Sequence, residues 1–282
     1  MRFGYNLSTA VEPGVDPAAE AREAEALGYD FVSVSDHLHG RHPTHETWTF
    51  LTWVAAATSR VQVVPNVLGL PYRAPAVLAK MAESLQRLSG GRLVLGYGAG
   101  GMDAEFEAFG LDVRAPGAKV EALEDALTIL RGTWAETPFT HEGAQLSVRG
   151  AAVEPKPIVP IPVWIGGNVP KVLALTGRLP GGWRASVPFA PPEVIPQRAA
   201  VVLRAAEAAG RSREDLTFVY NVGISVGARQ GDAGPVTGSP EEVAERLAEF
   251  EALGFDAINV WPAGDATEQR HRIAEEVLPL LR

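Results

Sequence analysis

Short apolar runs alternate with longer amphipathic stretches along most of the chain. The apolar runs are rich in β-branched residues, which is typical of buried strands. The stretches between them repeat apolar residues every three or four positions, as helices packed against a sheet do. The predicted strands are residues 3–7, 30–35, 61–67, 93–97, 163–165, 182–185, 217–226 and 257–260, and the predicted helices include residues 17–27, 48–58, 74–88, 120–134, 192–209, 240–253 and 268–281.

About eight strand–helix units in a chain of 282 residues predict an α/β protein whose fold is a (β/α)8 TIM barrel. The helix ends agree with this alternation: Ser239 and Pro240 form a typical helix start, and Gly28 and Gly254 are typical stops. A doubly wound sheet is the alternative, but such a sheet usually carries a glycine-rich turn after its first strand. Residues 6–10 are not such a turn, so the barrel is favoured.

Two segments interrupt the alternation. Residues 138–154 are strand-like and rich in turn residues, and they predict an insertion or small hairpin after the fourth strand–helix unit. Residues 154–162 are rich in proline and must be extended. They form either a linker between domains or a crossing that delivers the fifth strand, and the crossing is favoured because they lead directly into that strand. The whole chain, residues 1–282, is therefore interpreted as one domain.

The net charge of −9 at pH 7 argues against nucleic acid as a partner, because phosphate binding needs a surplus of Lys and Arg. The chain has no cysteine, which excludes disulfides, thiolate metal ligands and cysteine nucleophiles. No apolar stretch is long enough to span a bilayer, and the first residues enter a strand without a signal-peptide core. We therefore expect a cytoplasmic protein that acts on a small molecule, with no membrane or nucleic-acid partner.

The second predicted strand ends in two ionisable residues, Asp36 and His37. A buried strand has no folding reason to finish on such a pair just where the chain enters a loop. In parallel α/β proteins, the carboxyl ends of the strands carry ligands and catalytic groups. The pair therefore predicts an active site.

Four of the six histidines lie between residues 37 and 45. His37 and His39 have the spacing of a metal-ligand pair at a strand end, as in metal-dependent barrel hydrolases. Such hydrolases need further ligands on later strand ends, and only His141 and His271 remain, in the turn-rich insertion and the last helix. A solvated loop with one functional histidine is therefore favoured over a metal site.

The third predicted strand contains Pro65 and Asn66. Pro65 cannot donate to a central ladder, so it marks a bulge or the end of the strand. Asn66 tolerates unusual backbone angles. Taken alone, the sequence leaves open an ordinary strand exit and a strained bulge that pushes into the barrel mouth.

Glycines are concentrated after the fourth and fifth strands, in residues 96–101 and 166–171. Glycine lets the backbone approach a ligand closely and leaves N–H groups free to bind anions. Asn168 is a candidate N-cap, and the helix start behind it suits a phosphate, with Lys171 as a counter-charge. No acidic residue follows at the spacing of a Rossmann site, so the two turns indicate a phosphorylated ligand bound in another way. Trp183 is interpreted as a core aromatic.

With these residues in view, the chain resembles the luciferase-like monooxygenase superfamily. Within it, the chain is most similar to the actinobacterial-type oxidoreductases that use the deazaflavin coenzyme F420. The resemblance covers nearly the whole chain. The segments that carry it are residues 35–37, 71–80, 88–100, 161–167 and 238–243.

The resemblance implies a bound deazaflavin. Asp36 would contact the ring or its polar edge, and His37 would lie close to the redox-active ring carbon as acid–base group or stabiliser. Asn66 and Val67 would be joined by a non-proline cis peptide that backs the bent ring. Gly69 is a further implied contact. The implied contacts with the ribityl-phosphate tail are Ala99, Gly100, Gly166, Gly167 and Asn168.

The chain departs from the family pattern at three places. Sugar-phosphate dehydrogenases of this type carry a glutamate general base where Gly101 stands, so the resemblance does not identify the substrate class. The family's common aspartate before the tryptophan is Gly182, and a usual arginine corresponds to Ala118 or Lys119. The residues implied for the cofactor pocket are kept, whereas those of the substrate pocket do not identify a substrate.

The sequence thus predicts an oxidoreductase that transfers a hydride between F420 and a small organic substrate, with His37 as the catalytic residue. One alternative is an FMN-dependent monooxygenase of the same superfamily. A second is a metal-dependent barrel hydrolase that uses His37 and His39, and a third is a non-catalytic binding relative. The resemblance also implies a homodimer.

Overall fold

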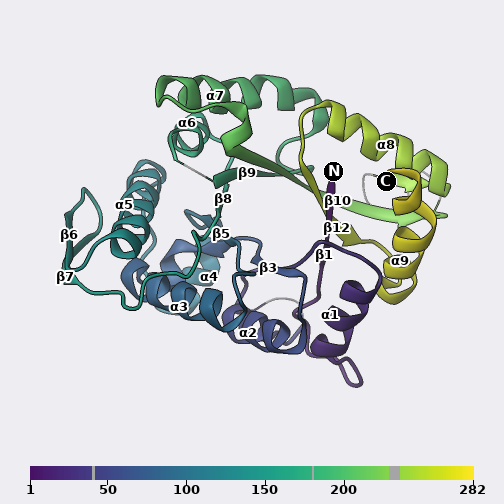
Figure 1. Cartoon of the computed structure of the whole chain (residues 1–282), viewed down its shortest axis with the longest axis horizontal. Coiled ribbons are helices and arrows are strands. Elements are labelled where there is room, and N and C mark those ends of the chain that lie inside the picture. The colour runs from purple at the N-terminus through teal and green to yellow at the C-terminus, as the bar shows by residue number, and fades with distance from the viewer. Residues whose placement is uncertain (40–41, 180, 229–235) are drawn as a thin grey trace.

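The main sheet of the molecule is a barrel of parallel strands with helices around its outside (Figure 1). The computed structural model describes residues 1–39, 42–179, 181–228 and 236–282. The barrel strands are β1 Arg2–Asn6, β2 Phe31–Val34, β3 Gln62–Pro65, β4 Leu68–Gly69, β5 Leu95–Gly98, β8 Val163–Gly166, β9 Gly181–Ser186, β10 Leu216–Val226 and β12 Ala257–Pro262. The short strand β11, Val236–Gly238, pairs with β10.

The strand order is β3-β2-β1-β12-β10-β9-β8-β5-β4, and the neighbouring strands are parallel. β3 meets β5 at a parallel bridge between Val63 and Leu93, and β4 also pairs with β5. The sheet therefore closes on itself. β3 and β4 together occupy the third position of an eight-position barrel, which confirms the predicted TIM barrel and all eight predicted strands.

The helices within the described residues are α1 Pro17–Ala26, α2 Thr47–Ala57, α3 Pro75–Leu88, α4 Asp103–Ala108, α5 Pro116–Ala135, α6 Pro170–Arg178, α7 Ile195–Ala208, α8 Pro240–Ala252 and α9 Ala266–Arg272. The sequence assigned no helix to α4 and only a helix start, without a range, to α6, because six and nine residues are too few to establish a helical period. The predicted helix 268–281 is divided into α9, a π-helical turn Ile273–Val277 and a 3₁₀ turn Leu278–Leu280.

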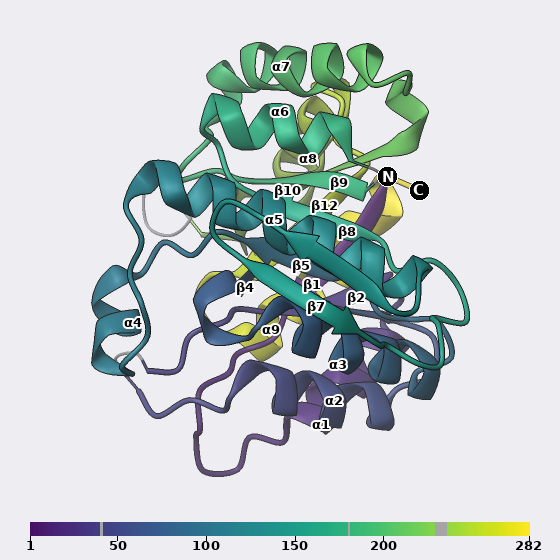
Figure 2. The same ribbon diagram turned by 90° about the vertical axis from the view of Figure 1, so that its left-hand side faces the viewer.

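The segment between α5 and β8 forms a two-stranded antiparallel hairpin, β6 Phe139–Glu142 and β7 Ser147–Ala151, which packs against α5 (Figure 2). Asp125 on α5 holds the hairpin, because its carboxylate accepts from the Gln145 and Leu146 amides at 2.7 and 3.0 Å. Residues 154–162 then run to β8 without helix or strand, tied to α3 by Lys80 and Arg87. They are the extended crossing that the sequence favoured.

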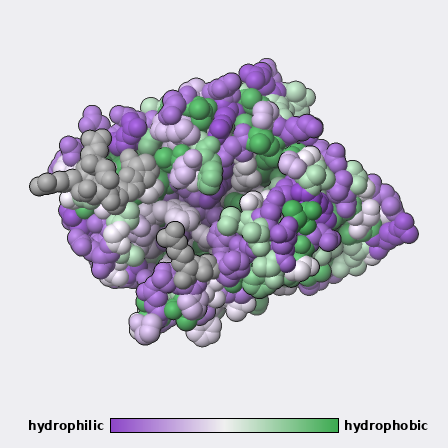
Figure 3. All heavy atoms as spheres, turned by 180° about the vertical axis from the view of Figure 1, so that it is seen from behind, coloured by the Kyte–Doolittle hydropathy of each residue, from purple (hydrophilic) through white to green (hydrophobic). Residues whose placement is uncertain are grey.

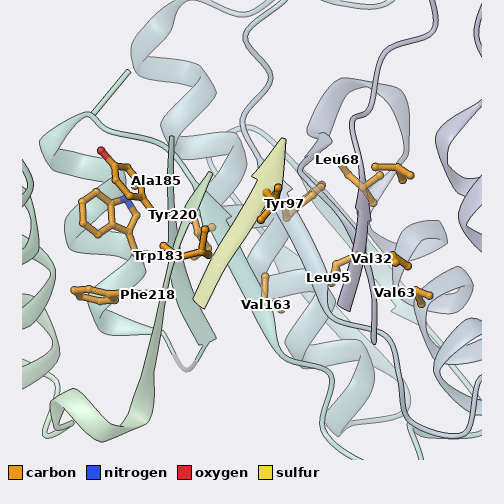
Figure 4. Packing of buried hydrophobic residues seen from close by; sticks show 14 of the residues in the cluster. Val32, Val63, Leu68, Leu95, Tyr97, Val163, Trp183, Ala185, Phe218 and Tyr220 are labelled. Atoms are coloured by element: carbon orange, nitrogen blue, oxygen red, sulfur yellow. The ribbon is translucent and has the colours of Figure 1, made fainter. Parts of the chain in front are cut away.

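Alternate residues of each barrel strand face two different cores. The larger core joins the strands to the helices, and part of it is seen in Figure 4. The smaller core contains residues of the strands and Val94 directly before β5, and none from a helix, so it fills the barrel interior. It consists of Phe31, Val64, Val94, Trp164, Val219 and Ala257. Trp183 belongs to the larger core, where its ring packs edge-on against Phe218 at 5.5 Å, which confirms it as a core aromatic. Its neighbour Arg184 consequently faces the barrel interior.

Candidate active site

The segments that the sequence singled out follow the carboxyl ends of β2, β3, β5 and β8. Parallel strands bring these ends to one rim of a barrel. Direct contacts join them: Val67 packs on Gly166, and the Asp36 carboxylate accepts from the Gly69 amide at 2.8 Å. Figure 3 shows the face on the far side from Figure 1, where hydrophilic residues predominate.

The chain between β3 and β4 forms a bulge that fills part of the barrel. The Asn66–Val67 peptide is cis, as the resemblance implied. Pro65 and Val67 press against Gly96 and Gly166, so the ordinary strand exit is wrong. Glycines on the facing strands make room for the bulge. A Cβ on Gly96 would lie 1.9 Å from the Pro65 carbonyl oxygen, and a Cβ on Gly166 would lie 2.8 Å from Val67 Cγ2. These two glycines are therefore explained by the bulge, without reference to a phosphate.

Asp36 anchors the bulge from the side of β2. Its carboxylate accepts from Arg73 at 3.0 and 3.2 Å, and the side chain has no exposed surface. Arg73 also pairs with Glu46. Burial alone would lower the pKa of Arg73, but Asp36 and Glu46 raise it. Both Asp36 oxygens therefore bind groups of the protein itself, and the predicted contact of Asp36 with a ring stays a prediction. The Gly69 N–H is occupied in the same way.

His37 is the residue of the predicted pair that reaches the mouth of the barrel. Its side chain is 45% exposed, and its Nδ1 lies 3.0 Å from Oε2 of Glu105, which is 2% exposed. Glu105 also accepts from the Leu38 amide and, at 3.3 Å, from the His39 amide. A carboxylate at Nδ1 favours the tautomer with the proton on Nδ1, which leaves the Nε2 lone pair free to accept a proton.

Glu105 is ionised in this arrangement. Burial alone would raise its pKa, but the hydrogen bonds from His37 and the Leu38 amide outweigh burial and lower the pKa. The sequence missed this residue, because it found Gly101 where the resemblance required a glutamate. The structure brings in a carboxylate four positions later, from the short helix α4. The run of acidic residues directly after the glycine turn was the available signal.

A layer of polar side chains lies inside the barrel, beyond the apolar interior core toward the carboxyl ends of the strands. It consists of Asn6, Ser33, Asn66, Arg184, Asn221 and Asn259. Asn66 Nδ2 donates to Asn221 Oδ1 at 3.1 Å, and Arg184 Nε donates to Asn66 Oδ1 at 2.6 Å. The bulge is thus hydrogen-bonded to β9 and β10 on the opposite wall. Apart from Asn66, the sequence did not single out these residues.

The two glycine-rich turns differ in the contacts that their residues make within the protein. Gly100 has a φ of +88°, and a Cβ there would lie 2.7 Å from Phe106, so glycine is required. Lys119 contacts the Gly100 carbonyl at 3.4 Å and pairs with Asp103. Asn168 is not the N-cap of α6, because that position is Val169 with Pro170 as the first helical residue.

Asn168 Oδ1 is buried and has no hydrogen-bond partner within the described residues. A buried polar atom without a partner is costly, and a hydroxyl group of a bound ligand would satisfy it. The residues of the rim thus fit a ligand with a flat ring over the bulge and a hydroxyl-bearing chain beside Asn168. Ala99 and Gly100 directly follow β5, and Gly167 directly follows β8.

The alternative of a metal-dependent hydrolase would need a set of metal ligands near His37 and His39. Within the described parts of the chain, no group of three or more His, Cys, Asp or Glu side chains could hold a metal ion. His39 instead stacks on Phe109, with ring centres 5.9 Å apart. No helix among the described residues is long and apolar enough to cross a membrane.

The protein is thus a closed (β/α)8 barrel. At the carboxyl ends of its strands it carries a histidine–carboxylate pair and an inward bulge, an arrangement typical of TIM-barrel active sites. Residues 1–235 match the luciferase-like monooxygenase family, and the chain belongs to this family. The F420-dependent glucose-6-phosphate dehydrogenase of Microbacterium testaceum is 27% identical over 100% of this chain and 98% of that protein. The enzyme of the same description from Kineococcus radiotolerans is 32% identical over 65% of this chain and 56% of its own length.

Solved structures share the fold. An F420-dependent secondary alcohol dehydrogenase in complex with an F420–acetone adduct has a TM-score of 0.89 at 18% identity, covering 100% of this chain and 99% of that one. The monooxygenase RslO1 from Streptomyces bottropensis has a TM-score of 0.82 at 23% identity, and both chains are covered fully. The fold is therefore common to proteins described with different reactions.

The glycine wall around the bulge yields a stability prediction. Gly96→Ala forces a methyl group against the Pro65 carbonyl, so we expect a loss of about 2 kcal/mol, as in overpacked cores. For a protein of this size, that loss lowers Tm by roughly 4–8 °C. Gly101→Ala is the matched control, because a Cβ there meets nothing within 4 Å. Equal melting temperatures for both variants, measured by calorimetry, would contradict the assigned role of Gly96.

Proposed function

We propose that the protein is an oxidoreductase that transfers a hydride between coenzyme F420 and a carbon of a small alcohol or carbonyl substrate. The observation that supports this proposal most directly is the hydrogen-bonded pair of His37 and buried Glu105 at the rim beside the bulge. The relatives described as F420-dependent dehydrogenases support the choice of cofactor. F420 supplies the two-electron hydride chemistry when it is bound.

The protein contributes position and proton transfer. The bulge at Asn66 and Val67 supports one face of the ring, while Ala99, Gly100 and Asn168 border the tail. His37 Nε2 accepts the hydroxyl proton of an alcohol, or returns it in the reverse direction. Glu105 holds the imidazole by its Nδ1 and stabilises the protonated ring by its negative charge.

We also propose that the protein acts as a homodimer in the cytoplasm, where its small substrate is available. The exposed face of α2 supports the dimer. Trp53 on this helix is 62% exposed and lines a hollow of about 700 Å³ together with Pro17, Trp48 and Phe50. An exposed aromatic side chain beside an apolar hollow is typical of interfaces between proteins.

The cofactor assignment is tested by titrating the purified apoprotein with F420 and, separately, with FMN. We expect saturable binding of F420 at micromolar concentration or below, and binding of FMN at least about tenfold weaker, which corresponds to about 1.4 kcal/mol. Tryptophan fluorescence quenching measures both. Tighter binding of FMN than of F420 would replace the proposal with an FMN-dependent monooxygenase.

The proton-transfer role is tested with His37→Ala and Glu105→Gln. We expect His37→Ala to lower kcat by about 10²-fold, the lower range for loss of a general acid–base group, while the Kd of F420 stays within threefold. Added imidazole restores part of the activity of His37→Ala but none of that of Glu105→Gln, because the latter still holds its own imidazole. Unchanged turnover in His37→Ala would remove this residue from the mechanism.

The dimer is tested with Trp53→Glu. A carboxylate on the exposed α2 face would have to be buried unpaired in the interface, so we expect a monomer by light scattering. Leu280→Glu, which changes another exposed apolar residue, stays dimeric. A monomeric wild-type protein, or a Trp53→Glu protein that remains dimeric, would contradict the assignment of this interface.

A further inference from the structure

Arg184 places a positive charge inside the mouth of the barrel. It lies on β9, and its side chain faces inward because its neighbour Trp183 belongs to the helix-facing core. Arg184 Nε donates to Asn66 Oδ1 at 2.6 Å, and Nη2 lies 3.4 Å from the Asn66 carbonyl oxygen. The Asn221 amide can also turn its oxygen toward Arg184. All of these acceptors are neutral.

The charge of Arg184 has no carboxylate partner among residues 1–39, 42–179, 181–228 and 236–282, and burial alone lowers its pKa to about 10. It therefore remains protonated at neutral pH. By contrast, Arg73 is paired with Asp36 and Glu46, and Arg270 with Glu20 and Glu23. A buried charge without a counter-charge is costly, and such groups are concentrated at functional sites.

Arg184 is also reachable by a ligand. The residue is only partly enclosed, so some of its surface is accessible to solvent. In the closed strand order, β9 lies four positions from β2 in either direction, if β3 and β4 count as one. Arg184 is therefore on the wall opposite the strand that carries His37, and the bulge lies between them.

Hydride transfer creates a negative charge in such a site. The C–H bond of the substrate carbon breaks, and its electron pair moves with the hydrogen to the ring carbon of the oxidised deazaflavin. The ring is reduced by two electrons and takes up a negative charge delocalised over its nitrogen and carbonyl oxygen atoms. The hydroxyl proton of the substrate goes to His37, and the substrate becomes a carbonyl compound.

We propose that Arg184 is the cation that binds the negative charge of the reduced deazaflavin, and that it thereby favours the reduced cofactor over the oxidised one. This inference rests on the proposed function. A planar guanidinium suits a delocalised anion, and its fixed position beside the bulge needs no rearrangement when the charge forms. A guanidinium could also bind an acidic group of a substrate. The experiment distinguishes this substrate anion from the anion of the reduced cofactor.

The test compares the Kd of oxidised F420 with that of reduced F420, without substrate and without oxygen, in the wild type and in Arg184→Met and Arg184→Lys. We expect Arg184→Met to weaken binding of reduced F420 at least about tenfold and to change binding of oxidised F420 less than threefold. A tenfold differential corresponds to a fall of about 30 mV in the two-electron potential of the bound cofactor. Arg184→Lys, which keeps the charge, restores part of the preference.

Arg204→Met is the matched control, since it removes an arginine from the exposed face of α7, and it leaves both affinities unchanged. Calorimetry confirms that each variant is folded, and Arg184→Gln, which keeps donors to Asn66, replaces Arg184→Met if the latter does not fold. Equal weakening of both forms would overturn the inference. So would unchanged affinities combined with a higher KM for acidic substrates alone. A wild-type protein that binds neither form would overturn the proposed function itself.

Discussion

The candidate site depends on one packing constraint, the insertion of the bulge at Asn66 and Val67 into the barrel. Side chains normally fill the interior of an eight-stranded barrel. Here the strands that face the bulge carry glycine at the points of closest approach, such as Gly96 and Gly166, and Val67 takes the space that their side chains would fill. The backbone of one strand thus becomes part of the floor of the mouth, and it can be displaced only by moving several strands.

Two kinds of polar contact hold this floor. On one side, the buried Asp36 binds both Arg73 and the Gly69 amide, so the ends of the bulge are fixed to β2. On the other side, neutral amides join Asn66 to β10, and Arg184 joins it to β9. The first contact is a neutralised ion pair, whereas the second leaves a positive charge. The site is therefore electrostatically asymmetric before any ligand enters.

The strands and the rim of this site could be predicted because each follows from a local pattern. β-branched runs define the strands, and ionisable residues stand out at the end of an apolar run, as Asp36 and His37 do. The pattern could not separate the roles of these two residues, since it does not show that Arg73 covers Asp36 while His37 stays partly exposed. The sequence did not identify Glu105 and Arg184 as site residues for a related reason. A carboxylate in a six-residue helix and an arginine within a strand resemble ordinary surface residues until tertiary contacts bury them.

The two residues that sequence reasoning missed complete the electrostatics of the proposed reaction. Removing a hydride and a proton from one alcohol group deposits a negative charge on the ring and a positive charge on His37. Glu105 stands behind His37, and Arg184 stands on the opposite wall. Each new charge therefore forms near a fixed charge of opposite sign, in a site whose dipoles are already held by the bulge and its amides. Such preorganisation favours the charge-separated state without the cost of reorienting water, and a barrel provides it because strands on opposite walls are held at a constant separation.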